Sequence, residues 1–283
     1  MSAATRSRIR DTVDMLMSPW FPLYRDLTVN PVDLTGKNAI VTGANIGIGF
    51  ECARKLAQMN ANVTLACRSA GKGEAAKKEL VESTGNKNVQ VALLDTSSFA
   101  SVKEFVNEWG SKPVDILINN AGMTASHYLK TDDGIEASFQ INFMSHFLLT
   151  SLLLPSLQPQ ARIVNVASIG HYTGQMQPED VDRSLFLERG VKVAVGDVLD
   201  AQTFLGIYAD AKLSQVAFSR ELQTRLDASP AFQSKKIIVS SCHPGLVASS
   251  IFDRNVGKST HADVFIQKVK PFVSRLGSEF GRS

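Results

Sequence analysis

From about residue 37 onward, short apolar runs rich in valine, isoleucine and leucine alternate with longer segments that have helical periodicity. The apolar runs show little polar alternation, which is typical of strands that helices cover on both faces, and such strands form parallel sheets. Right-handed crossovers place the connecting helices on both sides of the sheet. This order therefore predicts an α/β fold: a Rossmann-type, doubly wound parallel sheet in a three-layer αβα sandwich.

The chain has 283 residues, 44% of them hydrophobic, which is enough to bury the core of one such fold, and we expect a single domain. The expected strands cover residues 38–42, 63–67, 89–94, 115–119, 162–167 and 236–242. The expected helices cover residues 49–59, 73–82, 101–109, 134–154 and 208–226.

Two segments stand outside this alternation. Residues 1–35 form an N-terminal extension in which Ile9, Val13 and Leu16 recur at helical spacing. We expect an amphipathic helix there, lying either on a membrane surface or against the body of the protein. Residues 173–205 interrupt the rhythm before the last expected helix. Ligands bind outside the carboxyl ends of the strands in such sheets, so this insertion is expected to lie near the substrate; a surface insertion is the alternative.

A glycine-rich turn, Thr-Gly-Ala-Asn-Ile-Gly-Ile-Gly, joins the first expected strand to the first helix. Because Gly43, Gly47 and Gly49 have no side chains, the backbone can approach a pyrophosphate, and the helix amino terminus supplies N–H donors and partial positive charge. Asn45 and Ile48 belong to the same turn. A dinucleotide is the expected ligand, and a tight turn without a ligand is the alternative.

The end of the second expected strand indicates which dinucleotide binds. NAD sites usually carry an acidic residue at this place to bind the ribose 2′-hydroxyl. This chain has Arg68 there, with Lys72 nearby. Since an arginine can bind a 2′-phosphate through charge-assisted hydrogen bonds, NADP, as NADPH, is expected in preference to NAD. A solvated arginine is the alternative.

Tyr208 and Lys212 are four residues apart in an expected helix and therefore share one face. The pKa of a phenol is near ~10, and an adjacent positive charge lowers it by favouring the phenolate. The pair predicts proton transfer at neutral pH, and hence an enzyme. Residues 36–283 are accordingly expected to form an NAD(P)-binding Rossmann catalytic domain.

Charge and composition argue against other functions. The 30 basic and 27 acidic residues are scattered without a long run of one sign, so no nucleic-acid partner is expected. The three cysteines are widely spaced and the five histidines lack metal-ligand spacing, so we expect neither a disulfide framework nor a metal site. His146 is expected in the core. Without a signal peptide or a spanning stretch, the expected location is intracellular and cytoplasmic, with peripheral membrane contact through residues 1–35 as the alternative.

Taken in order, these motifs resemble the short-chain dehydrogenase/reductase family, and more narrowly its retinol-dehydrogenase-like members. The resemblance extends from about Leu34 to Val247. Its motifs are the glycine turn, Asp95, Asn-Asn-Ala-Gly at 119–122, Thr-Asp-Asp-Gly-Ile-Glu at 131–136, Arg-Ile-Val-Asn-Val-Ala-Ser at 162–168, the Tyr208/Lys212 pair and His-Pro-Gly-Leu-Val at 243–247.

The resemblance implies a role for each motif. Tyr208 would exchange a proton with the substrate oxygen, Ser168 would hydrogen-bond that oxygen, and Lys212 would lower the tyrosine pKa and hold the nicotinamide ribose. Asn142 would fix a helix kink and a water in a proton relay. The other implied cofactor contacts are Asp95 at the adenine, Asn120, Ala121 and Gly122 at the ribose, and Pro244, Gly245, Val247 and Ser249 near the nicotinamide.

Two features depart from the family. Ser168 and Tyr208 are 40 positions apart, which is wider than usual, so we expect an unusual pocket wall. Only 38 residues follow Gly245, and no last strand is recognisable among them. The sequence therefore does not decide whether the protein has the family's substrate lid or forms its helix-paired homodimer. The leading hypothesis is an NADP-dependent enzyme that interconverts a carbonyl and an alcohol on an apolar small molecule, such as a secondary metabolite, lipid or terpenoid-like compound. The alternative is a catalytically weak NADP-binding redox sensor or interaction protein.

Overall fold

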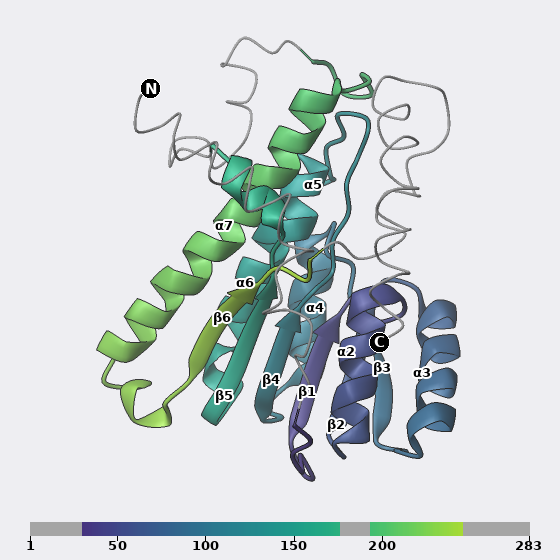
Figure 1. The fold of residues 1–283 in the computed structure, drawn as a ribbon, viewed down its shortest axis with the longest axis vertical. Coiled ribbons are helices and arrows are strands. Elements are labelled where there is room, and N and C mark those ends of the chain that lie inside the picture. The colour runs from purple at the N-terminus through teal and green to yellow at the C-terminus, as the bar shows by residue number, and fades with distance from the viewer. Residues whose placement is uncertain (1–29, 176–192, 246–283) are drawn as a thin grey trace.

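Six parallel strands form one sheet in the computed structural model, which describes residues 30–175 and 193–245 (Figure 1). The order across the sheet is β3-β2-β1-β4-β5-β6, and every neighbouring pair is parallel. The order reverses between β1 and β4, and ligands bind at such a switch point, outside the carboxyl ends of the strands. The strands are β1 (Asn38–Thr42), β2 (Asn62–Cys67), β3 (Val89–Leu93), β4 (Val114–Asn119), β5 (Leu157–Val166) and β6 (Ile238–Cys242).

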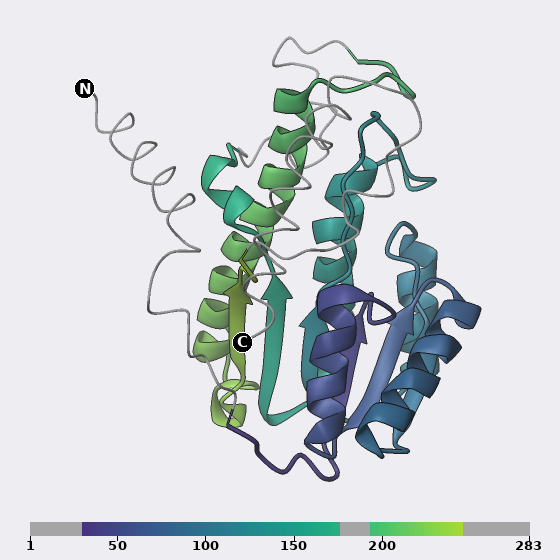
Figure 2. The ribbon, with the colours of Figure 1, turned by 45° about the vertical axis from the view of Figure 1, so that its right-hand side comes forward.

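Helices cover both faces of the sheet (Figure 2). One face is packed against α2 (Gly47–Gln58) and α3 (Ala70–Thr84), and the other against α4 (Phe99–Trp109), α6 (Ser145–Leu153) and α7 (Ala201–Ala228). The prediction of a doubly wound, three-layer αβα fold is therefore confirmed. The shorter helical segments are α5 (Ala137–Phe139), η3 (Gln140–Met144), η4 (Leu154–Ser156), η5 (Ile169–Thr173) and η8 (Gln233–Lys235).

Successive side chains of β1 enter different cores. Ala39 and Val41 belong to the apolar cluster beneath α2 and α3, whereas Ile40 belongs to the cluster beneath α4, α6 and α7. All three side chains are fully buried. Burial of one aliphatic side chain stabilises the fold by about 1.5–3 kcal/mol, so both faces of the strand favour apolar residues, and the apolar run is unbroken.

Two strands begin more than one residue away from the expected start. β5 begins at Leu157 rather than at residue 162, because Leu157 already pairs with Val114 and the register then shifts. β6 begins at Ile238 rather than at residue 236. Lys236 has a left-handed backbone, with φ 51°, and so ends the preceding turn instead of starting the strand.

The helices start within three residues of the expected positions except for α7, and the helix expected at residues 134–154 is interrupted. α7 begins at Ala201, where the Asp200 side chain caps it by accepting a hydrogen bond from the backbone N–H of Thr203 at 2.8 Å. Residues 201–205 of the expected insertion are therefore helical. The helix expected at residues 134–154 starts only at Ala137 and is interrupted by the π-helical segment η3.

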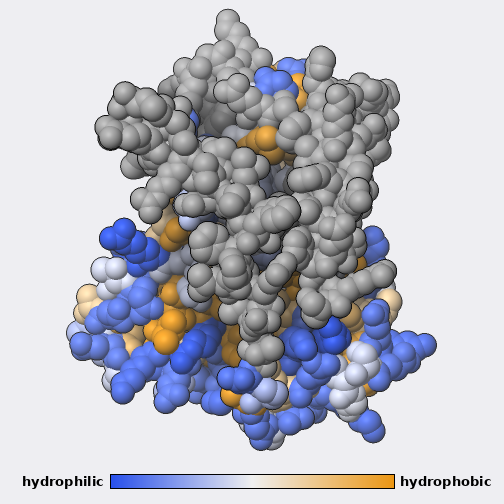
Figure 3. Space-filling model, viewed as in Figure 1, coloured by the Kyte–Doolittle hydropathy of each residue, from blue (hydrophilic) through white to orange (hydrophobic). Residues whose placement is uncertain are grey.

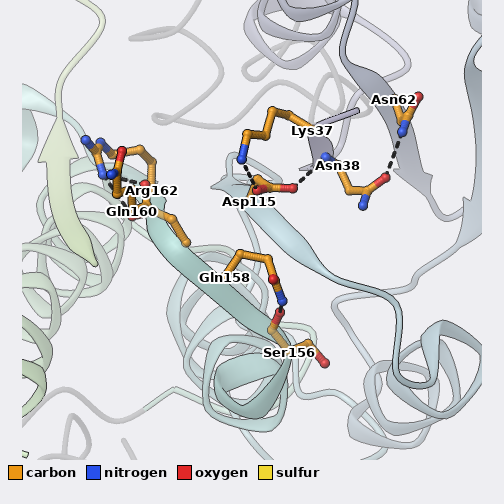
Figure 4. Close-up of polar contacts among 9 residues, drawn as sticks. Lys37, Asn38, Asn62, Asp115, Ser156, Gln158, Gln160 and Arg162 are labelled. Atoms are coloured by element: carbon orange, nitrogen blue, oxygen red, sulfur yellow. Dashed lines mark hydrogen bonds and ion pairs between the residues drawn. The ribbon is translucent and has the colours of Figure 1, made fainter. Parts of the chain in front are cut away.

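Polar contacts join the amino ends of β1, β2 and β4 (Figure 4). The Asp115 carboxylate accepts hydrogen bonds from Lys37 Nζ at 3.0 Å and from the backbone N–H of Asn38 at 2.9 Å. Asn62 Nδ2 donates to Asn38 Oδ1 at 3.0 Å. These contacts lie at the edge opposite the switch-point crevice, so they fix the strands relative to one another and do not contribute to a ligand site there.

One segment of the described chain, Ala137–Ser156, is long and apolar enough to cross a membrane by length and composition. It contains α6, whose Leu149 and Leu153 are fully buried in the core shared with α4 and α7. We therefore interpret it as a core helix. The surface of the described residues seen in Figure 3 is mainly hydrophilic, with scattered hydrophobic areas.

Candidate active site

The glycine turn after β1 lies against the loop that follows β4. A Cβ added to Gly43, whose φ is +63°, would lie 2.9 Å from the Cα of Ala121. A Cβ added to Gly49 would meet the side-chain amide of Asn120 and would lie 2.6 Å from the carbonyl oxygen of Gly43. Glycine is therefore required at these two positions by the close approach of protein segments, and this approach fixes the shape of the turn.

The amino end of α2 has the features of an anion-binding site. Gly47 is its first residue, and the preceding Ile46 makes no capping hydrogen bond with its side chain. The first N–H groups of a helix have no partner within the helix, and they favour negative charge. Asn45 and Ile48 are half-buried beside them. The turn therefore presents backbone donors of the kind that bind a pyrophosphate.

The Thr42 hydroxyl, at the end of β1, connects three segments. Its oxygen accepts hydrogen bonds from the backbone N–H groups of Asn120 and Ala121, each at 2.9 Å. His146 Nε2 lies 3.0 Å from the same oxygen, and His146 Nδ1 lies 3.2 Å from the carbonyl oxygen of Asn142. A carbonyl can only accept, so Nδ1 carries the proton and Nε2 accepts from the threonine hydroxyl.

The buried His146 side chain makes the stability of the fold depend on pH. Burial lowers its pKa from 6.5 to about 4, so the folded protein holds the neutral imidazole. The unfolded chain takes up a proton below its ordinary pKa. We expect the free energy of unfolding to fall by up to about 3 kcal/mol as the pH decreases from about 6.5 to about 4. Denaturant titrations across this range, with His146→Gln as the comparison, measure the effect; equal pH dependence in both proteins would contradict it.

Asn142 lies in the π-helical segment η3 and is fully buried. Its Nδ2 donates to the carbonyl oxygens of Met123 and Ser138 at 2.8 and 2.7 Å. A Cβ added to Gly122 would lie 2.6 Å from Asn142 Oδ1, so the loop after β4 lies directly against this amide. Such π-helical turns are frequent at functional sites. The π-helical segment contains the residue at which the family resemblance implies a helix kink. The role of Asn142 in a proton relay stays a prediction.

Ser168 and Tyr208 lie close together at the carboxyl end of β5, although they are far apart in the sequence, and Ser168 lowers the pKa of the phenol. Ser168 caps η5 and accepts a hydrogen bond from the backbone N–H of Gly170 at 3.2 Å. A Cβ added to Gly170 would lie 3.5 Å from Ser168 Oγ and 3.8 Å from the Tyr208 ring. The hydroxyl and the phenol are therefore close enough to contact one substrate oxygen.

Lys212 lies one turn after Tyr208 on α7 and is 3% exposed. Its Nζ donates to the carbonyl oxygen of Val166 at 2.8 Å and to Gln215 Oε1 at 3.0 Å. The same atom lies 5.6 Å from the centroid of the Tyr208 ring. Burial lowers the pKa of Lys212 from 10.5 to about 7. The structure thus brings together the three side chains that the sequence predicts for catalysis.

The pKa of Tyr208 departs from the expected direction. Burial raises it, and the hydrogen bond with Ser168 offsets only part of this effect. The net pKa of the phenol is therefore raised rather than lowered, because burial disfavours the phenolate. The expected lowering of this pKa by Lys212 stays a prediction.

The residues expected at the adenosine end follow two neighbouring strands. Arg68 follows β2 directly, and Lys72 lies in the first turn of α3; both are exposed. Asp95 is the second residue after β3, and its Oδ1 accepts hydrogen bonds from the backbone N–H and the hydroxyl of Ser97 at 2.9 and 2.6 Å. β2 pairs with β3, so the structure places all three residues along one part of the carboxyl edge.

The residues expected near the nicotinamide are described only in part. Pro244 and Gly245 follow β6 and are exposed, and Gly245 has a φ of +75°. Val247 and Ser249 lie outside the described residues, as do residues 1–29 of the N-terminal extension. The membrane contact and the homodimer stay predictions.

The insertion expected near the substrate is described at its two ends. Residues 176–192 lie outside the described part. Residues 193–199 lie beside the loop after β4: the N–H of Tyr128 donates to Asp197 O and the N–H of Leu199 donates to Ser126 O, each at 2.8 Å. This part of the insertion therefore lies on the carboxyl side of the sheet.

Two contacts in this region are not predicted from the sequence. Thr42 and His146 are 104 positions apart, and no local pattern connects them. Gln215 lies three residues after Lys212 on α7 and contacts it. Their spacing in the sequence, which places both on one helix face, could have predicted this contact.

The comparison with known sequences gives one family. The family model for short chain dehydrogenases matches residues 37–178. Retinol dehydrogenase 11 of Mus musculus is 39% identical over 224 residues, which are 78% of this chain and 64% of that protein. Retinol dehydrogenase 11 of Homo sapiens is 39% identical over 233 residues, which are 81% of this chain and 67% of that protein. The aligned part of the chain thus spans only about two thirds of the length of these relatives.

Solved structures share the fold. A short chain dehydrogenase/reductase from Burkholderia phymatum in complex with NAD has a TM-score of 0.62 at 22% identity, covering 86% of this chain and 80% of that chain. A blue fluorescent protein from a metagenomic library in complex with NADPH has a TM-score of 0.56 at 23% identity, covering 86% of this chain and 90% of that chain. With the fold shared and the family model matched from β1 to beyond η5, the chain belongs to the short-chain dehydrogenase family.

Proposed function

We propose that this protein is an NADP-dependent oxidoreductase that interconverts a carbonyl and an alcohol on an apolar small molecule. The observation that carries the proposal is the convergence of three side chains: Ser168 Oγ and the Tyr208 ring both lie against Gly170, and Lys212 Nζ lies 5.6 Å from the centroid of the Tyr208 ring. The likeness to relatives named retinol dehydrogenase 11 supports an apolar alcohol or aldehyde as the substrate.

The three side chains divide the chemistry between them. Bound nicotinamide supplies the hydride in reduction and accepts it in oxidation. In reduction, Tyr208 donates its phenol proton to the carbonyl oxygen, and the Ser168 hydroxyl hydrogen-bonds the same oxygen and stabilises its developing charge. Burial raises the pKa of Tyr208, so the phenol is protonated at neutral pH, as a proton donor requires. The Lys212 ammonium stabilises the phenolate that remains.

The residues at the carboxyl edge of the sheet fit both the pyrophosphate and the 2′-phosphate of NADP. The backbone at Gly43 and Gly49 has no room for side chains, and the amino end of α2 presents N–H groups without a capping side chain. These features suit a pyrophosphate. Arg68 and Lys72 supply two exposed cations at the end of β2, which suits the 2′-phosphate of NADP. NADP rather than NAD is therefore the cofactor that we propose.

The substrate is proposed to bind beside the start of α7. Tyr128, Leu199, Phe204 and Ile207 form a small buried apolar cluster there, where residues 193–199 lie against the loop after β4. These four side chains are buried against one another and hold residues 193–199 at the start of α7. Phe204 and Ile207 precede Tyr208 on the same helix, so this apolar region adjoins the proton donor, and apolar surroundings favour an apolar substrate.

We expect Arg68→Asp to shift the preference from NADPH toward NADH by about 10- to 100-fold. The variant loses charge-assisted hydrogen bonds to the 2′-phosphate and gains an acceptor for a 2′-hydroxyl. The measurement is the ratio of kcat/KM for the two coenzymes. Arg225→Asp is the matched control, because Arg225 is an exposed arginine that pairs with Glu221 near the distal end of α7. A ratio that stays the same in Arg68→Asp would refute the phosphate assignment.

The proposed activity is tested by supplying the purified full chain with NADPH and a panel of apolar aldehydes and ketones, and with NADP and the matching alcohols. Coenzyme absorbance reports turnover, and product analysis identifies the bond that changes. Turnover of at least one carbonyl compound to its alcohol is expected. If the chain binds NADPH and turns over no member of the panel, the proposal fails in favour of a cofactor-binding sensor.

A further inference from the structure

Gln215 is a buried side chain whose amide contacts the proposed catalytic lysine. It is 1% exposed and lies three residues after Lys212 on α7, so both side chains are on one helix face. Its Oε1 accepts a hydrogen bond from Lys212 Nζ at 3.0 Å. Its Nε2 has no hydrogen-bond partner among the described residues.

The protonation state of the lysine decides how this amide is oriented. An ammonium has three donors and no acceptor, so only the amide oxygen can face it favourably. Turning the amide over would place N–H against N–H and would leave the oxygen unpaired. The Nε2 group is left without a partner in the observed orientation. The observed orientation therefore serves the contact between the amide oxygen and Lys212 Nζ.

Three titratable groups that influence or adjoin Lys212 are neutral at neutral pH. Tyr208 precedes Lys212 on α7, and Cys242 at the end of β6 and His146 on α6 interact with it electrostatically. Burial raises the pKa of both the phenol and the Cys242 thiol, and it lowers the pKa of His146 to about 4, so all three are neutral. Burial has the largest effect on the pKa of Lys212, and Cys242 has a smaller, opposite effect.

Two neutral oxygens therefore stabilise the buried ammonium: the carbonyl of Val166 at 2.8 Å and the amide of Gln215 at 3.0 Å. The first belongs to the backbone of β5 and is present whatever the side chain. The second depends on one residue.

We propose that Gln215 is a positioning residue, which holds Lys212 in its ammonium form and in its place beside Tyr208. Gln215 acts through the lysine and does not contact the substrate. The catalytic part of this inference rests on the proposed function. The contact between Gln215 and Lys212 can be tested in the protein without substrate.

The test compares substitutions of similar size at residue 215. Gln215→Leu removes the acceptor, so we expect the apparent pKa of Lys212 to fall by about one to two units. Gln215→Glu replaces the amide with a carboxylate, so we expect a rise of at least about the same size. The pKa is measured by NMR titration of lysine side chains labelled with ¹³C and ¹⁵N, and the Lys212 signal is assigned by its loss in Lys212→Arg.

A matched control lies on the same helix. Gln223 is a partly buried glutamine of α7 that bonds Ile237 O, Asp227 and the backbone N–H of Val239. Gln223→Leu is expected to reduce stability and to leave the Lys212 titration unchanged. This control separates loss of the specific contact from a general loosening of α7.

Shifts of opposite sign in the leucine and glutamate variants support the inference, and shifts of the same sign, or none, overturn it. If Gln215→Leu does not fold, the glutamate variant decides alone: an unchanged or lower pKa overturns the inference. The basic limb of the pH profile for carbonyl reduction is expected to move with the lysine pKa. If the NMR shifts are observed but the protein turns over no carbonyl compound, the inference about the Gln215 contact stands and only the proposed function fails.

Discussion

Tyr208→Phe is expected to lower kcat for carbonyl reduction by at least about a hundred-fold, because the variant keeps the aromatic ring and has no proton to donate. The hydroxyl that is removed is the group whose pKa Ser168 lowers. Coenzyme binding is expected to change little, since the ring still packs on α7. Single-turnover kinetics with NADPH, together with a direct measurement of coenzyme affinity, separate the chemical step from binding.

A second tyrosine near the site provides the control for this loss. Tyr172 lies in η5, four residues after Ser168; its ring is 4.1 Å from that of His171, and it is 48% exposed. Tyr172→Phe removes an equivalent hydroxyl and is expected to leave the rate of reduction nearly unchanged. If the two variants are equally active on a substrate that the native protein reduces, Tyr208 is not the proton donor.

The direction of the reaction gives a further check on the same residue. Reduction requires the protonated phenol, and oxidation of an alcohol requires the phenolate. Burial raises the pKa of Tyr208, so the phenolate fraction grows only at high pH. Oxidation by the native protein is therefore expected to increase with pH over a range in which reduction does not.

The strands were the most predictable part of the fold, because their sequence pattern follows directly from burial on two faces. Ala39, Ile40 and Val41 illustrate this: neighbouring side chains enter different cores, and each core selects for apolar residues. The start of β5 was not predictable in this way. Its early residues include Gln160, which has a φ of +64°, and the pairing with β4 is irregular there. Such irregularity interrupts the apolar pattern.

The candidate site was predictable where residues share an element and less so where the fold brings distant elements together. Tyr208 and Lys212 are close because helix geometry places them so. Their proximity to Ser168 was implied by the family resemblance and not by spacing. The direction of the Tyr208 pKa was missed because the sequence shows the neighbouring cation and not the burial, and burial has the larger effect here.

Thr42→Val is expected to lower the free energy of unfolding by about 3–5 kcal/mol, although the two side chains have nearly the same shape. Valine has no oxygen to accept the N–H groups of Asn120 and Ala121, both at 2.9 Å, and no proton for His146 Nε2 at 3.0 Å. Each donor or acceptor left unpaired inside the protein costs about 1–3 kcal/mol. Denaturant unfolding at neutral pH measures the loss, which is a large share of the roughly 5–15 kcal/mol that stabilises a typical domain.

Thr42→Ser isolates the hydroxyl as the cause. Serine keeps the oxygen and the proton and loses one buried methyl group, which costs about 1 kcal/mol. If valine costs no more than the roughly 1 kcal/mol expected for serine, the hydrogen bonds of the Thr42 hydroxyl contribute little to stability, and the argument from geometry fails. If valine alone has the large effect, the same variant should also bind coenzyme more weakly. The loop at Asn120 and Ala121 packs on the glycine turn, where Gly43 lies against Ala121, so loss of its anchor at Thr42 loosens the proposed coenzyme site.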